Sequence, residues 1–324
     1  MRVLVTGEKG FIAQNLPKSF EKLGSSVVNT DSLAGFERIS TGEICVHRNS
    51  SEKWADLFVN ENIDAVIHNA AKVGTDVVAL DHTESVLTNV DGTYNIITAA
   101  NIAKIPVCYM GTTVIYDTPK YQDSAITETS EQSPNTLYGA LKQVSETILR
   151  SQAKQWSIIR PLFAYGGVGD MNSLVAKSFY SHLRRSGKQL DMFLDPQKKK
   201  DYLHVEDYCD AVATACVGDF WCDDFNVAAE TPYTVGEIVD MMSDACGKDL
   251  SYMISWKPET DYLGNHVLST EKFRKASGWS PQIPLKSGII RSWRSILSNR
   301  DEDYNPLKHL EEASDRGIDL TQFF

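Results

Sequence analysis

The sequence predicts an α/β fold, built as a doubly wound parallel sheet with a smaller, mixed C-terminal lobe. Short apolar runs alternate with amphipathic segments over the first 160 residues, and this alternation loosens afterwards. Several runs are unbroken, which is typical of strands that helices cover on both faces. We therefore expect a first lobe over residues 1–165, a second lobe over 166–298 that is interleaved with it, and a polar extension over 299–324.

Each element follows from its pattern of apolar residues. Apolar runs predict strands, and apolar residues at helical spacing predict helices. The expected strands are 2–6, 26–29, 44–47, 65–69, 107–110 and 157–160. The expected helices are 12–23, 53–60, 83–102 and 137–154 in the first lobe, and 174–185, 206–217, 235–245 and 286–297 in the second.

Composition narrows the possible partners. The net charge of -11 argues against nucleic acid or an anionic membrane surface as the main partner. The N-terminal apolar run stops at Gly7, and no run approaches the roughly 20 apolar residues of a membrane helix. The six cysteines form no C-x-x-C pair and no zinc-like spacing with histidine. We expect reduced thiols, no metal site and a cytoplasmic protein.

The segment VTGEKGFIAQNL, residues 5–16, places Gly7, Gly10 and Ala13 at every third position across a strand-to-helix junction. Gly7 permits a tight turn, Gly10 lets a pyrophosphate approach unpaired backbone N–H groups, and Ala13 lets the helix pack closely. Such glycines can also serve turn geometry alone. Asp31, at the end of the second predicted strand, favours a dinucleotide site, because its carboxylate can bind an adenosine ribose. It would also repel a 2′-phosphate, which favours NAD over NADP.

Tyr138 and Lys142 are four residues apart on a predicted helix, so their side chains share one face. A tyrosine has a pKa near 10, and an adjacent ammonium favours the phenolate that could act as a base. Pairs of the same spacing begin at Tyr116 and Tyr304, but each contains a proline and neither lies on a credible helix. Tyr138 and Lys142 are therefore the catalytic candidates.

Thr112 lies 26 residues before Tyr138, just beyond the predicted strand 107–110. A hydroxyl at this strand end can donate to a developing carbonyl oxygen or pass a proton to the tyrosine. Thr113 is the adjacent competitor, and either residue could be an ordinary turn threonine.

Together these residues resemble the extended short-chain dehydrogenase/reductase family, in its nucleotide-sugar epimerase/dehydratase branch. The resemblance covers the chain to about residue 298. Its segments are TGEKGFIA (T-G-x-x-G-F), DAVIHNAAKVG at 64–74 (H-x-A-A), NVDGTYNIITAA at 89–100 (N-x-x-G-T), GTTVIYD at 111–117 (S-S-x-x-V-Y-G), YGALK at 138–142 (Y-G-x-S-K), KDYLHVEDYCDAV at 200–212, FNVAAETPYTVGEI at 225–238 and SGWSPQIPLKSGI at 277–289.

The resemblance implies a Rossmann-type first lobe that binds NAD and a substrate-binding second lobe. It implies a nucleotide sugar as substrate, epimerisation through a keto intermediate, and a homodimer formed by helices 83–102 and 137–154. A keto-sugar reductase or dehydrogenase is the alternative, and a non-catalytic dinucleotide-binding regulator is a third hypothesis. The implied catalytic residues are Thr112, Tyr138 and Lys142; the cofactor-binding residues are Gly7, Gly10, Phe11, Ile12, Asp31, Ala70, Ala71, Lys72, Asn89, Tyr138, Lys142 and Pro161; the substrate-binding residues are Thr112, Thr113, Phe163, Lys200 and Lys257.

Some positions depart from the family pattern. Phe163 replaces an asparagine that contacts the substrate's diphosphate side, and Lys200 and Lys257 stand where arginines are expected. A lysine is a point charge without the bidentate fork of arginine; the run 198–200 could attract an anion or be a solvated loop. Thr113 and Val114 replace the acid pair of sugar 4,6-dehydratases, which argues against dehydration. The epimerising cysteine of the GDP-fucose synthase group would also fall on Val114, so 3,5-epimerisation is not supported.

Overall fold

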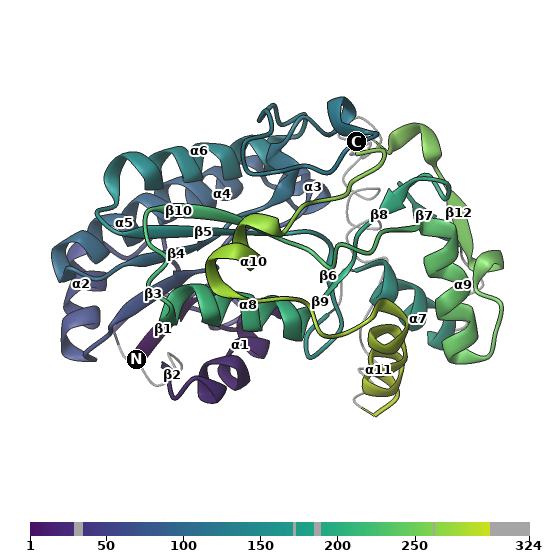
Figure 1. Ribbon diagram of the computed structural model, residues 1–324. Coiled ribbons are helices and arrows are strands. Elements are labelled where there is room, and N and C mark those ends of the chain that lie inside the picture. The colour runs from purple at the N-terminus through teal and green to yellow at the C-terminus, as the bar shows by residue number, and fades with distance from the viewer. Residues whose placement is uncertain (29–34, 171–172, 185–188, 262, 299–324) are drawn as a thin grey trace.

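The computed structural model describes residues 1–28, 35–170, 173–184, 189–261 and 263–298 (Figure 1). Its main sheet has six parallel strands in the order β10-β5-β4-β3-β1-β2, which confirms the predicted fold class. The strands are β1 (Arg2–Thr6), β2 (Ser26–Val28), β3 (Ala65–His68), β4 (Val107–Met110), β5 (Trp156–Pro161) and β10 (Asp223–Val227).

Helices cover both faces of this sheet, as Figure 1 shows. Alternate side chains of one strand enter different cores: Val3 and Val5 pack with α1 and α8, whereas Leu4 packs with α2 and α5. This two-residue period is what a sheet buried on both faces requires. The covering helices are α1 (Phe11–Lys22) and α8 (Val205–Val217) on one face, and α2 (Ser51–Asn60), α5 (Gly92–Ala103) and α6 (Leu137–Gln152) on the other.

The strand predicted at 44–47 is wrong. Ile44 forms only an isolated antiparallel bridge with Arg38. The backbone after it is held by Asn49, whose Nδ2 donates to the carbonyls of Glu37 at 3.0 Å and Cys45 at 2.8 Å. The run is buried against the core of α2 and α5, and an apolar run alone does not distinguish a buried strand from a buried loop.

The single helix predicted at 83–102 contains an irregular turn. It consists of α4 (His82–Val86), a π-helical turn η1 (Leu87–Asp91) and α5, and a short helix α3 (Thr75–Leu80) precedes it. The π turn contains Asn89, one of the expected cofactor ligands. Such turns recur at functional sites because they release backbone carbonyls from the regular helical pattern.

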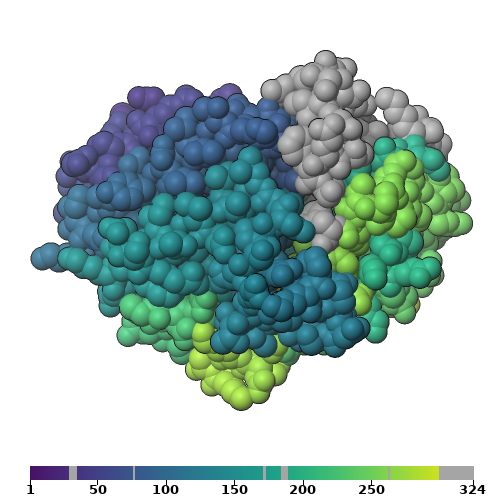
Figure 2. Space-filling view, turned by 90° about the horizontal axis from the view of Figure 1, so that it is seen from above, coloured from purple at the N-terminus to yellow at the C-terminus, as the bar shows by residue number. Residues whose placement is uncertain are grey.

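The second lobe packs three helices around its own apolar core and adds three two-stranded sheets. In the space-filling view, the purple first segments of the chain lie at the upper left and green to yellow-green segments at the right, with a further yellow-green segment at the lower edge (Figure 2). β10 and α8 return from this half to the main sheet, and the boundary at residue 165 stays a prediction. The three helices are α7 (Leu174–Arg184), α9 (Val235–Cys246) and α11 (Leu285–Ser298), and the sheets pair β6 (Ala164–Tyr165) with β9 (Leu203–His204), β7 (Leu190–Met192) with β12 (Ile254–Trp256), and β8 (Lys199–Lys200) with β11 (Tyr233–Thr234). Helix α10 (Glu271–Ser277) instead packs its Phe273 into the core of the main sheet.

Two of the predictions lie outside the described residues, namely the ribose contact of Asp31 and the polar extension over 299–324. Within the described ranges, no helix combines the length and the apolar character that crossing a membrane requires. The six cysteines, all of them described, are free thiols.

Candidate active site

The turn between β1 and α1 is shaped to accept an anion. Gly7 has a φ of +69°, and a Cβ atom in its place would lie 2.9 Å from the Cα of Ala70. Gly10 is the N-cap of α1, and its N–H donates to the carbonyl of Gly7 at 2.9 Å. The N–H groups of Phe11 and Ile12 belong to the first helical turn, which has no intrahelical acceptors for them. These residues fit the diphosphate of a dinucleotide.

The loop after β3 crosses this turn. Thr6 Oγ1 accepts hydrogen bonds from the N–H groups of Asn69 at 3.2 Å and Ala70 at 3.1 Å. Asn69 Nδ2 donates to the carbonyl of Gly7 at 3.3 Å. The strand order reverses at β1 and β3, and open parallel sheets bind their ligands at such a point. Ala70 and Ala71 are half-buried there.

Asn89 holds the next residue of this loop. Its Oδ1 accepts from the N–H of Lys72 at 2.7 Å, and its Nδ2 donates to the carbonyl of Lys72 at 3.0 Å. The backbone carbonyl of Asn89, in the π turn, accepts from the hydroxyls of Thr93 at 2.6 Å and Ser145 at 2.7 Å. Asn89 therefore ties the loop after β3 to α5 and α6, and its side chain is already bonded within the protein.

A buried chain of polar groups, which the sequence did not indicate, continues from Asn89. His68 lies between Thr93, 3.0 Å from its Nε2, and Thr6, 2.8 Å from its Nδ1. Because Thr93 donates to Asn89 and Thr6 already accepts two N–H groups, a neutral imidazole protonated on Nε2 satisfies each hydrogen bond of this chain. Burial, together with the ammonium of Lys142, lowers the pKa of His68 to about 3, so the ring is neutral.

Tyr138 and Lys142 lie on the first two turns of α6, where Thr136 caps the helix. Both side chains are buried. The Nζ of Lys142 donates to the carbonyl of Met110 at 2.6 Å and lies 4.1 Å from the ring centroid of Tyr109. The ammonium is thereby held at the carboxyl end of β4, on the same edge of the sheet as the glycine turn. Their chemical roles stay predictions.

Thr112 lies two residues beyond β4 and caps the 3₁₀ turn η2 (Thr113–Ile115), with its Oγ1 accepting from the N–H of Val114 at 3.5 Å. This turn lies against the start of α6, since a Cβ on Gly139 would be 2.7 Å from the carbonyl of Val114. Val114 also packs against the apolar cluster that contains Tyr138. The fold thus places the loop of Thr112 against the start of the helix that carries Tyr138.

The expected substrate residues Thr113 and Phe163 enter a largely apolar region. The hydroxyl of Thr113 donates to the carbonyl of Pro161 at 3.4 Å. The ring of Phe163, at a φ of +27°, stacks on Tyr202 with centroids 5.2 Å apart and meets the edge of His266 at 5.8 Å. An aromatic group therefore stands where the resemblance implies a hydrogen-bonding amide.

Lys200 is not part of a solvated loop, because its side chain is fully buried. Its Nζ lies 2.9 Å from Asp261 Oδ1 and 2.5 Å from the carbonyl of Gly264. Burial lowers the pKa of Lys200, and the carboxylate of Asp261 opposes that effect. Lys257 is more open and lies 3.7 Å from Asp191. A substrate phosphate would have to compete with Asp261 for Lys200.

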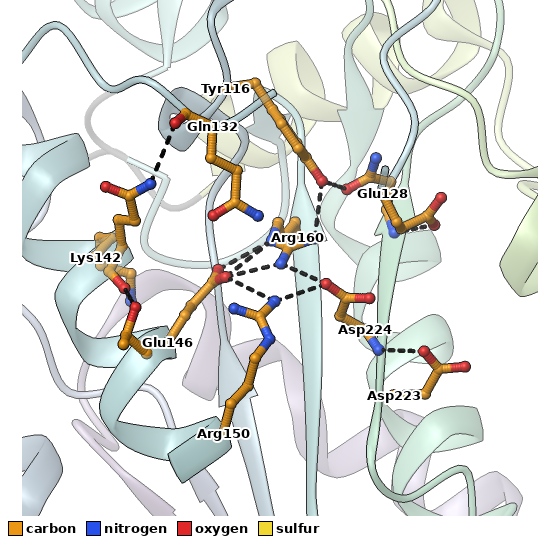
Figure 3. Close-up of polar contacts among 12 residues, drawn as sticks. Tyr116, Glu128, Gln132, Lys142, Glu146, Arg150, Arg160, Asp223 and Asp224 are labelled. Atoms are coloured by element: carbon orange, nitrogen blue, oxygen red, sulfur yellow. Dashed lines mark hydrogen bonds and ion pairs between the residues drawn. The ribbon is translucent and has the colours of Figure 1, made fainter. Parts of the chain in front are cut away.

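A network of charged side chains lies near Lys142, where α6 meets β5 and β10 (Figure 3). Nη2 of the fully buried Arg160 lies 2.7 Å from Glu146 and 2.6 Å from Asp224. Arg150 reaches the same carboxylates at 3.3 and 2.7 Å, and the hydroxyl of Tyr116 accepts from Arg160 at 2.8 Å. Sequence reasoning missed this network, although Glu146 follows the Tyr-x-x-x-Lys pair by one helical turn.

Cys45, His47 and Glu84 also lie together, with possible ligand atoms within 4.8 Å of one another. The sulfur of Cys45 is 3.5 Å from Nδ1 and 3.7 Å from Nε2 of His47, so it is not aligned with the lone pair of either nitrogen. Glu84 is 3.6 Å from His47 and 3.5 Å from Arg48. A metal shared by the thiol and one ring nitrogen would require a different orientation of the ring.

Known proteins resemble this chain along most of its length. A dTDP-glucose 4,6-dehydratase of Streptomyces niveus is 24% identical over 341 aligned residues, which cover 97% of this chain and 98% of the relative. The structure of the Thermotoga maritima UDP-glucose 4-epimerase with UDP-glucose has a TM-score of 0.76 at 20% identity, covering 93% of this chain and 100% of the other. The Bacillus anthracis dTDP-glucose 4,6-dehydratase with NAD has a TM-score of 0.76 at 18% identity, covering 93% and 97%.

The family model described as the NAD dependent epimerase/dehydratase family matches residues 3–228. The match spans the glycine turn, the loop after β3 and the helix of Tyr138 and Lys142. When bound at the glycine turn, NAD would supply a hydride acceptor at the edge of the sheet where these side chains lie. The chain belongs to the NAD-dependent epimerase/dehydratase family, whose members are nucleotide-sugar enzymes of the extended short-chain dehydrogenase/reductase type.

Proposed function

We propose that this protein is an NAD-dependent epimerase that acts on a nucleotide sugar through a transient keto intermediate. The observation that carries the proposal is the gathering of Thr112, Tyr138 and Lys142 at the sheet edge that also holds the glycine turn. A protein that only sensed a dinucleotide would need the turn but not this buried tyrosine and lysine.

Each residue has a distinct role in the proposed reaction. Tyr138 removes the proton from the C4 hydroxyl of the sugar, while the hydride on C4 would be taken up by NAD+ bound at the glycine turn. Lys142 favours the phenolate through its positive charge and binds the nicotinamide ribose. Thr112 donates a hydrogen bond to the carbonyl oxygen as it forms. The keto sugar then rotates within the site, the hydride returns to its opposite face, and Tyr138 returns the proton to the oxygen.

Dehydration must also be considered beside the reductase or dehydrogenase, because dehydratases are among the relatives. It requires an additional acid to assist loss of a hydroxyl. Thr113 and Val114, which follow Thr112, offer no carboxylate: the first donates to the carbonyl of Pro161 and the second packs beside Tyr138. These contacts favour an epimerase or an oxidoreductase over a dehydratase.

The proposed partner is a second copy of the chain. Large apolar side chains are exposed on the helices expected to form a dimer bundle, and their burial would favour association. They are Val86 at 40% on α4, Tyr94 at 51% and Ile102 at 53% on α5, and Leu137 at 40% and Val144 at 44% on α6.

The first test is to denature freshly purified protein and to measure the NAD that is released. An epimerase regenerates its cofactor in each turnover, so we expect close to one NAD per chain. An empty protein that binds NADH or NADPH would indicate the reductase or dehydrogenase, and a protein that binds neither would refute the dinucleotide site. Tyr138→Phe should retain the cofactor and lose conversion of nucleotide sugars.

A further inference from the structure

We propose that Glu146 is a positioning residue for Lys142: held in place by Arg160, it fixes where the ammonium lies and supplies the negative charge that faces it. The inference rests on the proposed function, in which Lys142 acts as a cation beside Tyr138. It follows from the geometry of the buried network and from the charges that face Lys142.

The Arg160–Glu146 pair locks α6 onto β5. Both side chains have 0% exposure. Nε of Arg160 donates to Glu146 Oε1 at 3.0 Å and Nη2 to Oε2 at 2.7 Å, a two-pronged contact that fixes direction as well as distance. Asp224 contacts both Arg160 and Arg150 (Figure 3), and it also lies 3.2 Å from Lys272. Removing one member of a buried pair of this kind is strongly destabilising.

The carboxylate of Glu146 lies against the backbone that holds Lys142. A Cβ on Gly111 would lie 2.9 Å from Glu146 Oε1 and 2.8 Å from Cγ of Arg160. The preceding residue, Met110, accepts the hydrogen bond from Lys142 at 2.6 Å. Glu146 and Lys142 lie one turn apart on α6, so the carboxylate that Arg160 holds shares a helix face with the side chain that carries the ammonium.

Glu146 is also the source of negative charge at Lys142 within the described part of the chain. Besides Tyr138 and Glu146 on α6, the titratable groups facing the ammonium are Tyr109 on β4 and His68 on β3. Burial raises the pKa of Tyr109 and lowers that of His68, so both are neutral near pH 7. Burial lowers the pKa of Lys142 to about 7, and the charge of Glu146 opposes that effect.

An electrostatic role and a purely structural role of the Glu146–Arg160 pair therefore predict different effects on the protonation of Lys142. Glu146→Gln removes the negative charge and leaves Arg160 positive, so Lys142 should lose its proton more easily. Arg160→Met removes a positive charge and leaves Glu146 in contact with Arg150, so Lys142 should hold its proton more tightly. If the pair acted only by holding the fold together, both variants should change the acid dissociation constant of Lys142 in the same direction.

The experiment is a pH titration of lysine Nζ by ¹⁵N NMR in full-length protein without substrate, with the Lys142 signal assigned from Lys142→Met. We expect the acid dissociation constant of Lys142 to rise at least about tenfold in Glu146→Gln and to fall in Arg160→Met. In the double variant Glu146→Gln/Arg160→Met, the acid dissociation constant of Lys142 should lie between the values of the two single variants. Shifts of the same sign in both single variants, or no shift, would overturn the proposal.

If the single variants do not fold, Arg150→Met serves the same purpose. Its side chain is 31% exposed and contacts the same two carboxylates. Arg150→Met should lower the acid dissociation constant of Lys142, as Arg160→Met does, but by less. An unchanged or increased constant would contradict the proposal. Because the titration needs no turnover, a failure of the proposed epimerase would appear separately, as normal activity in Tyr138→Phe.

Discussion

Gly7 and Ala70 meet backbone to backbone: a Cβ atom on Gly7 would lie 2.9 Å from the Cα of Ala70 and 3.1 Å from its nitrogen. The turn after β1 and the loop after β3 therefore pack together at the point where the strand order reverses. Any side chain at position 7 would separate these two loops, and both are expected to border the cofactor.

Gly7→Ala should weaken NAD binding by at least about tenfold, since the added methyl group meets backbone that cannot turn aside. Gly24→Ala is the matched control, because Gly24 has a φ of +66° and nothing within 4 Å of the added Cβ. Both variants carry the cost of a left-handed alanine, about 1–2 kcal/mol. NAD affinity by calorimetry separates them, and equal losses in both variants would contradict the role of the close contact.

Thr112→Ala should lower kcat on the nucleotide sugar by on the order of 10²-fold, because one donor to the developing oxygen is lost. Thr113→Ala, next to it, should change kcat by less than about threefold, since that hydroxyl donates to the carbonyl of Pro161 instead. Steady-state kinetics of the two variants makes the comparison. The reverse order would assign the catalytic hydroxyl to Thr113.

The chain should lose stability as the pH falls from about 6.5 toward 4. The pKa of buried His68 is lowered to about 3 in the folded protein, so the unfolded chain, with a histidine pKa near 6.5, binds the extra proton in this window. The contribution of neutral His68 to the free energy of unfolding is fully present above pH 6.5 and decreases below it, by a few kcal/mol at most.

His68→Gln should reduce this pH dependence, because glutamine can accept from Thr6 and donate to Thr93 without titrating. Part of the dependence should remain, since burial also lowers the pKa of His266 to about 3 and that of His204 to about 4. His82→Gln, at an exposed position, is the control and should leave the slope as it is. Urea unfolding at several pH values measures the free energy of unfolding. Identical slopes in His68→Gln and in the unmodified protein would show that His68 does not cause the loss.

Lys200→Met should destabilise the fold by about 3–5 kcal/mol, because it leaves Asp261 buried without its partner. Lys200→Met/Asp261→Leu should recover most of this loss. Lys257→Met removes a partly exposed ion pair with Asp191 and should cost at most about 1 kcal/mol. Denaturant unfolding gives these values. A stable Lys200→Met that binds nucleotide sugar poorly would instead support direct phosphate recognition by Lys200.

Val144→Lys or Tyr94→Lys should convert the expected homodimer to a monomer, since each places a charge in the apolar surface of α5 and α6. Val59→Lys is the control on α2, where the valine is 60% exposed. Light scattering after size exclusion reports the mass. A dimer that survives both changes would place the interface elsewhere.

The local sequence was sufficient to predict those parts of the structure that depend on neighbouring residues. The glycines at 7 and 10 indicated a strand-to-helix turn, because only a few residue types allow that backbone. The spacing of Tyr138 and Lys142 placed them on one helix face, and α6 bears this out. The apolar run at 44–47 predicted a strand, but the structure has a buried loop there with one isolated bridge. An apolar run without alternation does not distinguish the two.

The sequence by itself determined the α/β alternation, the glycine turn and the helix of Tyr138 and Lys142, because these depend on neighbours within a few residues. Only the tertiary structure decided which distant groups meet: Glu146 with Arg160, Lys200 with Asp261, and His68 with two threonines. A buried charge or imidazole is stable only beside a partner, and that partner is set by how strands and helices pack, over separations the local pattern does not encode.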